Sequence, residues 1–240
     1  MKKVALVTAS NGGIGKSIVK KLLKKGYIVY SNGTTIQMDK NKLINFIQAD
    51  MTIDQEIKKV IDKIFNKEGR LDLVVANLGS GKSISGWDID NSEYKRIFDI
   101  NFFSSVILAT YSIKYLKKTN GNIIFISSIA GCESIGAPIP YSAAKSALLS
   151  FSKNLAKEVG KLKIRVNCIS PGNVMFKNST WDEKIKKDKK FVKNYIKQNV
   201  PMNKFATPKD ISKTVIFLEK NRFITGENIV VDGGQINKII

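Results

Sequence analysis

Short β-rich runs alternate with longer stretches of helical periodicity along most of the chain, and this alternation is its most restrictive feature. Several of the short runs are almost entirely apolar, as expected for strands covered on both faces. The expected strands are 4–8, 28–31, 43–48, 71–76, 122–127, 163–169 and 229–231. Strands that alternate with helices form a parallel sheet flanked by helices. We therefore predict an α/β fold: a single doubly wound domain over residues 1–240, with about seven parallel strands and helices on both faces.

The 240 residues include no histidine, which excludes several common mechanisms. Ser-His-Asp triads, Cys-His hydrolases and His-ligated zinc all need an imidazole. The acid or base must then be Tyr, Lys, a carboxylate or Cys. The two cysteines, Cys132 and Cys168, are too few and too far apart for a disulfide framework or a zinc site. We expect no metal, small structural roles for both cysteines, and a reducing, cytoplasmic setting.

The net charge of +20 raises the question of an anionic partner. Nucleic-acid binding is possible for such a chain, but only four of its 40 basic residues are arginine, the better reader of bases and phosphates. We therefore expect no nucleic-acid partner. No apolar run approaches the roughly 18 residues of a spanning helix, so we also expect no membrane partner.

A glycine-rich turn, TASNGGIG at residues 8–15, follows the first expected strand and precedes a helical pattern. Glycines let a backbone approach a pyrophosphate closely, and the helix N-terminus supplies free N–H groups to it. This order of strand, turn and helix indicates a Rossmann-type dinucleotide site. Gly15-Lys16-Ser17 also resembles the end of a nucleoside triphosphatase phosphate loop, but the first glycine of that motif would fall at Ser10.

A serine, a tyrosine and a lysine form the strongest candidate for chemistry. Tyr141 and Lys145 are four residues apart in a helical pattern, so their side chains share a face. An ammonium near a phenol favours the phenolate, so we expect Lys145 to lower the pKa of Tyr141. Ser128 ends the fifth expected strand, where its hydroxyl can bind a substrate oxygen that gains negative charge.

The glycine turn, Asn101, Ser128 and the Tyr-x-x-x-Lys motif together resemble the classical short-chain dehydrogenase/reductase family over essentially the whole chain. The resemblance implies an NAD(P)-dependent oxidoreductase that moves hydride between nicotinamide and a carbonyl or alcohol. Tyr141 would exchange the proton, Lys145 would tune it and hold the nicotinamide ribose, and Ser128 would orient the reacting oxygen. Asn101 would support a proton-relay water, although it could also serve only helix packing.

The same resemblance implies a set of cofactor-binding residues spread along the chain. They are Ser10, Asn11, Gly13, Ile14, Gly15, Asn32, Asp50, Met51, Asn77, Gly79, Tyr141, Lys145, Pro171, Gly172 and Val174. Three positions depart from the family pattern. Ala9 replaces the first glycine of the turn, which alanine tolerates if its φ is negative; Leu78 would narrow the cofactor pocket; Phe176 replaces a threonine that contacts the carboxamide in many members.

The choice between NADP and NAD depends on the end of the second strand, which reads Tyr30-Ser31-Asn32-Gly33-Thr34. An acid there would select NAD by binding the ribose hydroxyls, and a base would favour NADP. Neither is present. Because no carboxylate repels a 2′-phosphate, and because we expect Lys16, Asn32 and Thr34 to lie near that phosphate, NADP is favoured and NAD stays open.

The substrate segment is expected at residues 173–205, which should form a flap over the site. Its portion 177–200 contains eight lysines and three acids with interspersed aromatics, which fits either an anionic substrate or a solvated amphipathic helix. The loops at the expected site mouth resemble those of bacterial family members associated with surface-sugar biosynthesis, which favours a sugar or sugar nucleotide of surface-glycan biosynthesis as the substrate. A 3-oxoacyl-[acyl-carrier-protein] is the alternative, because that carrier is acidic. A non-catalytic Rossmann regulator is the alternative of another class. The resemblance implies a homotetramer, or a dimer.

Overall fold

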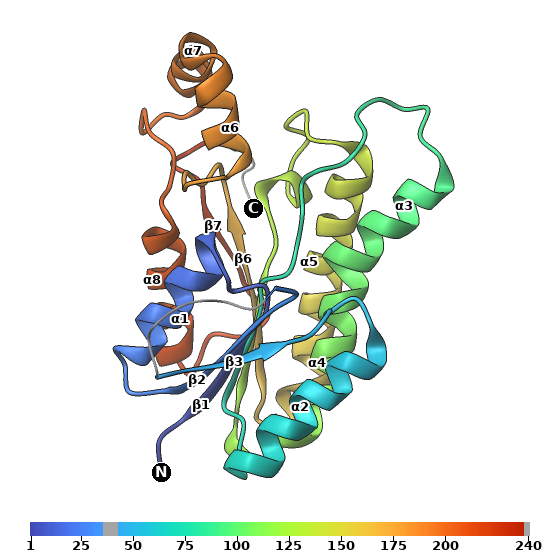
Figure 1. Cartoon of the computed structure of the whole chain (residues 1–240), viewed down its shortest axis with the longest axis vertical. Coiled ribbons are helices and arrows are strands. Elements are labelled where there is room, and N and C mark those ends of the chain that lie inside the picture. Colours follow the sequence, from blue (N-terminus) through green and yellow to red (C-terminus); the bar gives the residue numbers. More distant parts are fainter. Residues whose placement is uncertain (36–42, 238–240) are drawn as a thin grey trace.

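A seven-stranded sheet forms the centre of the computed structural model, which describes residues 1–35 and 43–237 (Figure 1). The strands are β1 (Val4–Val7), β2 (Ile28–Gly33), β3 (Ile44–Gln48), β4 (Leu73–Ala76), β5 (Asn122–Ile126), β6 (Arg165–Pro171) and β7 (Asn228–Val231). Every pairing in the order β3-β2-β1-β4-β5-β6-β7 is parallel. The predicted doubly wound fold is confirmed, and each predicted strand end lies within two residues of the observed one.

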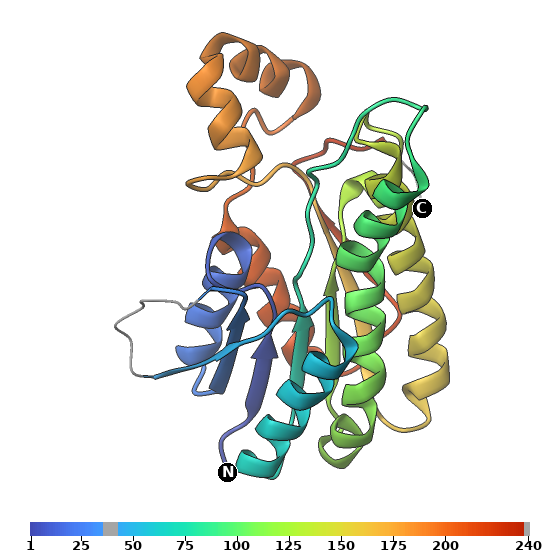
Figure 2. The same cartoon turned by 45° about the vertical axis from the view of Figure 1, so that its right-hand side comes forward.

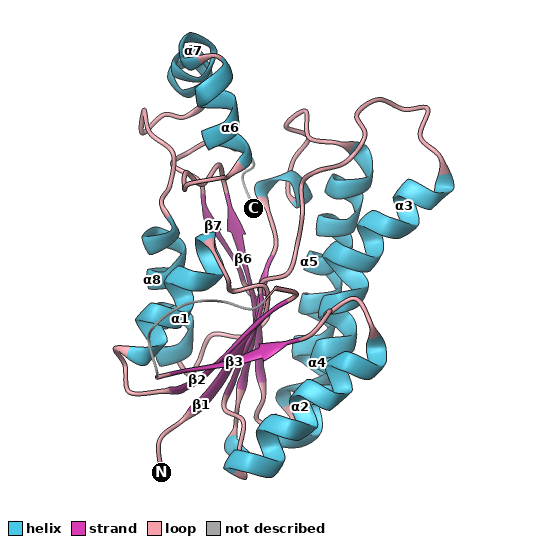
Figure 3. Cartoon of the chain, in the orientation of Figure 1, coloured by secondary structure: helices cyan, strands magenta, loops and turns pink. Residues whose placement is uncertain are grey.

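Helices cover both faces of this sheet, as Figure 3 shows by colour. The α-helices of the described residues are α1 (Gly13–Leu23), α2 (Asp54–Glu68), α3 (Asn91–Phe98), α4 (Ser104–Leu116), α5 (Ile139–Gly160), α6 (Thr180–Lys187), α7 (Lys189–Asn199) and α8 (Pro208–Lys220). Helices α1 and α8 lie on one face, and α2, α4 and α5 lie on the other (Figure 1). None of the helices in the described residues is long and apolar enough to cross a membrane.

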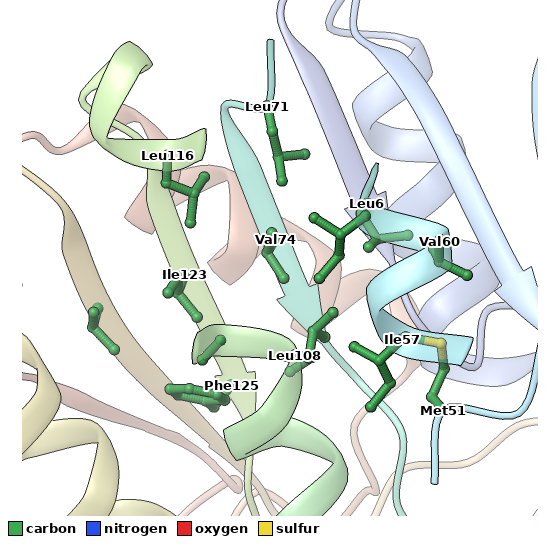
Figure 4. Packing of buried hydrophobic residues seen from close by; sticks show 14 of the residues in the cluster. Leu6, Met51, Ile57, Val60, Leu71, Val74, Leu108, Leu116, Ile123 and Phe125 are labelled. Carbon is green, nitrogen blue, oxygen red and sulfur yellow. The ribbon is translucent and has the colours of Figure 1, made fainter. Parts of the chain in front are cut away.

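The core consists of two apolar layers, one on each side of the sheet. On the α2, α4 and α5 side, Leu6, Val74 and Phe125 from the strands meet Ile57 and Leu108 from the helices (Figure 4). All four residues of β1 and of β4 are buried, because both faces of these strands are covered. This double burial explains why the strands read as continuous apolar runs.

The carboxyl ends of the strands point toward α6 and α7, which stand beyond that edge of the sheet (Figures 1 and 2). From β1 the chain continues to β2 on one side, and β4 lies on the other side of β1. Ligands of open α/β sheets bind at such a reversal of strand order, outside the carboxyl ends. The fold thus places the glycine turn after β1 at the position where a dinucleotide binds.

Ala9 in this turn corrects one expectation. Its φ is +47°, in the left-handed region, so it does not meet the condition of a negative φ under which we expected alanine to be tolerated. The turn keeps the backbone conformation that suits glycine, although the residue is alanine. It does so because Asn32 accepts a hydrogen bond from the Ala9 N–H at 3.3 Å and Asn77 donates one to the Ala9 carbonyl at 3.0 Å.

Replacing Ala9 with glycine should therefore stabilise the protein. A left-handed alanine costs about 1–2 kcal/mol, which glycine avoids. Glycine also increases the entropy of the unfolded chain, which offsets part of this stabilisation, so we expect a rise of about 0.5–1 kcal/mol in the free energy of unfolding. Urea denaturation followed by circular dichroism measures it. Ala147→Gly, inside α5, is the matched control and should lose about 1 kcal/mol. An Ala9→Gly variant less stable than the parent would contradict this account of the turn.

Candidate active site

A cleft of about 760 Å³ opens at the carboxyl edge of the sheet. The loop after β4, the end of β5, the start of α5 and the helices α6 and α7 all contribute to its walls. Nine of the predicted site residues line it: Ile14, Asn77, Gly79, Ser128, Tyr141, Lys145, Pro171, Gly172 and Val174. Ser10, Asn11, Gly13, Gly15, Asn32, Asp50, Met51 and Asn101 lie outside its lining. The catalytic candidates and the nicotinamide-side candidates therefore meet in one place.

Tyr141 lies in the first turn of α5, where Pro140 starts the helix with a favourable fixed φ. Ser128 lies close enough to the Tyr141 phenol to influence its pKa. Burial raises the pKa of the Tyr141 phenol above its ordinary value, and the Ser128 side chain lowers that pKa less strongly. The phenol is thus held protonated beside a hydroxyl that can orient an oxygen, as a proton donor to a carbonyl requires.

Lys145 follows one helical turn later and is almost completely buried. Its Nζ donates to the Ile126 carbonyl at 3.0 Å and lies 5.9 Å from the centroid of the Tyr141 ring. Burial lowers the pKa of Lys145 to about 8. The expected lowering of the Tyr141 pKa by Lys145 is not seen in this structure, because burial of the phenol outweighs the other effects and the ammonium is directed at a carbonyl.

Gly79 lets the lysine approach the loop after β4. A Cβ at this position would lie 2.9 Å from Lys145 Nζ, closer than real Cβ contacts, and 3.0 Å from Asn101 Oδ1, which is tighter than most of them. Leu78, which we expected to narrow the pocket, instead packs against the core on the α4 and α5 side and is not part of the cleft lining. The departure from the family pattern at Leu78 is therefore accommodated in the core.

Asn101 lies in a π-helical segment, Asp99–Phe103, between α3 and α4, and is fully buried. Its Oδ1 accepts from the Ser80 N–H at 3.0 Å, and its Nδ2 donates to the Ser80 carbonyl at 3.1 Å. The amide thus holds the cleft-lining loop from behind. Such π-helical turns are frequent at functional sites; the support of a relay water stays a prediction.

Glu93, on α3, fixes the same loop at a second point, and we did not predict it. Its carboxylate accepts from Ser83 Oγ at 2.8 Å and from the Ile84 N–H at 3.1 Å, and it is paired with Arg96. Arg96 also donates to the Lys82 carbonyl at 3.0 Å. The hydrogen bonds to Arg96 and then to Ser83 lower the pKa of Glu93 to about 2.

This lowered pKa predicts a pH-dependent contribution to stability. A carboxylate whose pKa is lower in the folded state stabilises fully above its unfolded value, about 4.3, and loses that contribution as the pH falls toward 2. Glu93→Gln should lower the urea midpoint at pH 7, and the difference between the midpoints of the variant and the wild type should decrease as the pH falls toward about 3. Glu158→Gln, an exposed change on α5, controls for the loss of one charge. A gap that does not change with pH would contradict the role of Glu93.

The adenosine side of the turn contains polar groups that fit a dinucleotide. Asn11 Nδ2 donates to the Thr35 carbonyl at 2.8 Å, while Asn11 Oδ1 is buried and has no hydrogen-bond partner. An acceptor in this state suits a hydroxyl donor such as that of a ribose. Asn77 fixes the turn by donating from Nδ2 to the Thr8 carbonyl at 3.1 Å. These residues would hold the adenosine half, and the cofactor would supply or accept hydride at the Tyr141 end of the cleft.

The side chains of several predicted cofactor-binding residues are engaged in hydrogen bonds or core packing within the protein. Ser10 Oγ bonds the Val7 carbonyl at 2.9 Å, and Asn32 Nδ2 donates to the Ala49 carbonyl at 3.0 Å; both residues are buried. Asp50 Oδ1 accepts from the Thr52 N–H at 2.9 Å, and the Met51 side chain lies in the core (Figure 4). Their cofactor contacts therefore stay predictions, and for Met51 only the backbone is left to make one.

The remaining predicted residues connect β6 to the segment 173–205. Pro171 ends β6, the Gly172 N–H donates to the Val231 carbonyl at 2.9 Å, and Val174 pairs with Ala206. The segment then forms α6 and α7 around a small apolar cluster of its own that includes Val192, Trp181 and Tyr195. Lys82, in the loop after β4, lies 3.8 Å from Glu183 on α6, so an exposed ion pair connects the two walls of the cleft. The substrate role of this flap stays a prediction.

Comparison with known proteins agrees with the site geometry in indicating an oxidoreductase. The sequence model of the family described as enoyl-(acyl carrier protein) reductase matches residues 8–235. A 3-oxoacyl-[acyl-carrier-protein] reductase, FabG, of Buchnera aphidicola is 34% identical over 98% of this chain and 97% of its own. An uncharacterized oxidoreductase of Schizosaccharomyces pombe is 31% identical over 98% of this chain and 91% of its own.

Solved structures agree in fold. ElxO with NADP bound has a TM-score of 0.88 and 30% identity, and the match covers 98% of this chain and 99% of that one. A short-chain dehydrogenase of Leptospira borgpetersenii with bound NAD⁺ has a TM-score of 0.85 and 28% identity, covering 98% and 92%. The fold and the site define a nicotinamide-dependent oxidoreductase. The chain belongs to the classical short-chain dehydrogenase/reductase family of NAD(P)-dependent enzymes.

Proposed function

We propose that this protein transfers hydride between NADP and a carbonyl or alcohol group, with Tyr141 as the proton exchanger. The observation that carries the proposal is the partly buried Tyr141 phenol, which lies near Ser128 and one helical turn from Lys145, in a cleft that the glycine turn also borders. In reduction, Tyr141 gives its proton to the oxygen that becomes the alcohol, and Ser128 holds that oxygen. Lys145 is the neighbouring cation, and Asn101 keeps the adjoining loop in place.

The preference for NADP rests on the end of β2. No carboxylate stands in Ile28–Gly33 to bind ribose hydroxyls or to repel a 2′-phosphate. The relative ElxO was solved with NADP, and the Leptospira relative with NAD⁺. Titration of both cofactors tests the preference: we expect a lower dissociation constant for NADP, and tighter binding of NAD would overturn it.

We further propose that the substrate carries negative charge next to an apolar group. Lys82 and Lys184 line the cleft together with Trp181 and Phe191, so that charge and aromatic surface adjoin. A sugar nucleotide and a 3-oxoacyl thioester on an acidic carrier both fit, and FabG relatives bear the name of the second reaction. Reduction of one class and not the other in a panel of both identifies the substrate; turnover of neither would contradict this proposal.

Two further predictions concern assembly and location. The family resemblance implies a homotetramer or a dimer, and Phe103, near the start of α4, is 46% exposed beside the rings of Phe98 and Phe102, which suits contact with a second copy. Light scattering coupled to gel filtration should give the mass of an oligomer of the 26.7 kDa chain. A cytoplasmic location is expected from the reducing setting that two free cysteines indicate.

A further inference from the structure

Phe176 contacts Gly13, in the middle of the glycine turn, although the two residues are 163 positions apart in sequence, and no mechanism described above uses it. A Cβ placed on Gly13 would lie 2.7 Å from both Cε2 and Cζ of the Phe176 ring. Gly13 has a φ of +48°, a backbone conformation that favours glycine, and the ring edge covers the space that a side chain would need. The ring also borders the cleft, next to Ile14.

The face of Gly13 under the ring is the place where the turn is built to receive phosphate. Gly12, the N-cap of α1, has no side chain to cap the helix, and the first turn of α1 contains no acidic residue. Both features keep the helix N-terminus available and positive for an anion. The glycine in the middle of such a turn is there so that the pyrophosphate can approach the backbone.

The ring is held in this position by its own segment. The Ser179 N–H donates to the Phe176 carbonyl at 3.0 Å, and Ser179 Oγ accepts from the Phe176 N–H at 3.4 Å. Phe176 is partly buried against the apolar layer that α1 and α8 form on the sheet. Contact with Gly13 is therefore part of an ordered structure, anchored at the N-cap of α6.

We propose that the Phe176 ring and the phosphates of the cofactor compete for the same face of Gly13, so that residue 176 sets the affinity for NAD(P). The proposal rests on the dinucleotide site proposed for the glycine turn. Cofactor binding must displace the Phe176 ring. Because the conformation with the ring displaced is less populated, the apparent affinity for the cofactor is reduced. A smaller side chain removes that cost, and a larger one increases it.

Isothermal titration of NADP and NAD into the purified, full-length chain and its variants tests this. Phe176→Thr should lower the dissociation constant of the preferred cofactor by about fivefold or more, Phe176→Leu should lower it less, and Phe176→Trp should raise it. Phe223→Ala removes an aromatic ring that is fully exposed and lies outside the cleft lining, and should change the dissociation constant by less than about twofold. Circular dichroism verifies that each variant is folded.

The outcomes separate this inference from the proposed function. If the wild type binds neither cofactor, the dinucleotide site itself is wrong. If the wild type binds and Phe176→Thr binds equally or more weakly, the ring does not compete with the phosphates, and weaker binding would mean that it supports the bound cofactor. Tighter binding that increases from Trp through Phe and Leu to Thr is the result that the proposal requires.

Discussion

Replacing Tyr141 with phenylalanine is expected to lower turnover by about 10²–10⁴-fold while leaving the dissociation constant of the cofactor nearly unchanged. The substitution removes one hydroxyl and keeps the ring that fills the start of α5. No histidine exists in the chain to replace the lost acid. Ser128 retains its hydroxyl, but an alcohol is a much weaker acid than a phenol, so it does not substitute for Tyr141.

The control for this prediction is the same chemical change elsewhere. Tyr111, on α4, donates its hydroxyl to Asp54 at 2.7 Å and lies outside the cleft lining. Tyr111→Phe should retain the wild-type turnover. Steady-state kinetics on a substrate found in the carbonyl panel gives turnover, and isothermal titration gives cofactor binding. A Tyr141→Phe enzyme with wild-type turnover would disprove the assigned role.

Replacing Arg165 with alanine is expected to cost about 3 kcal/mol of unfolding free energy. Arg165 lies in β6, and its guanidinium caps the C-terminus of α8. Nη1 donates to the carbonyls of Leu218 at 2.6 Å, Asn221 at 3.2 Å and Ile224 at 3.3 Å, and Nη2 donates to the Glu219 carbonyl at 3.0 Å. The last carbonyls of a helix have no partner within the helix. Losing the guanidinium removes the donor to the Glu219 carbonyl and one of the donors to each of the other three carbonyls.

Two further variants distinguish the loss of the carbonyl contacts of Arg165 from the loss of a positive charge. Arg165→Lys retains the charge but reaches fewer carbonyls, so its loss should be smaller than that of alanine. Arg222→Ala removes an exposed arginine just beyond α8 and should change stability by less than about 0.5 kcal/mol. Urea unfolding followed by circular dichroism measures all three. An alanine variant at position 165 as stable as Arg222→Ala would show that the carbonyls are satisfied without Arg165.

The sequence predicted the sheet because its strands are buried on both faces. Val4–Val7 and Leu73–Ala76 are apolar at every position, a pattern that a half-exposed strand would not have. The Tyr141 and Lys145 pair was predictable for a similar reason, since their spacing alone places them on one helix face.

Other parts of the site depend on contacts that no local pattern encodes. Glu93 reads as an ordinary helix carboxylate, and only the folded loop brings Ser83 and Ile84 to it. The separation of Glu93 and Arg96 by three residues was only a weak signal of their ion pair. The contact of Phe176 with Gly13 brings together residues that are far apart in sequence. The positive φ of Ala9 is stabilised by hydrogen bonds with Asn32 and Asn77. The pKa of Tyr141 was predicted in the wrong direction because burial cannot be read from spacing.

The central claim is that this protein moves hydride between a nicotinamide cofactor and a carbonyl carbon, and isotope transfer tests it most directly. Reduced NADP and NAD carrying deuterium at the transferable position are incubated with the wild type and a panel of sugar nucleotides and 3-oxoacyl thioesters. Mass spectrometry of the products measures the label. We predict an alcohol product with one deuterium from the wild type and almost none from Tyr141→Phe in the same time. Absence of labelled product from the wild type with both cofactors and every substrate would contradict the account.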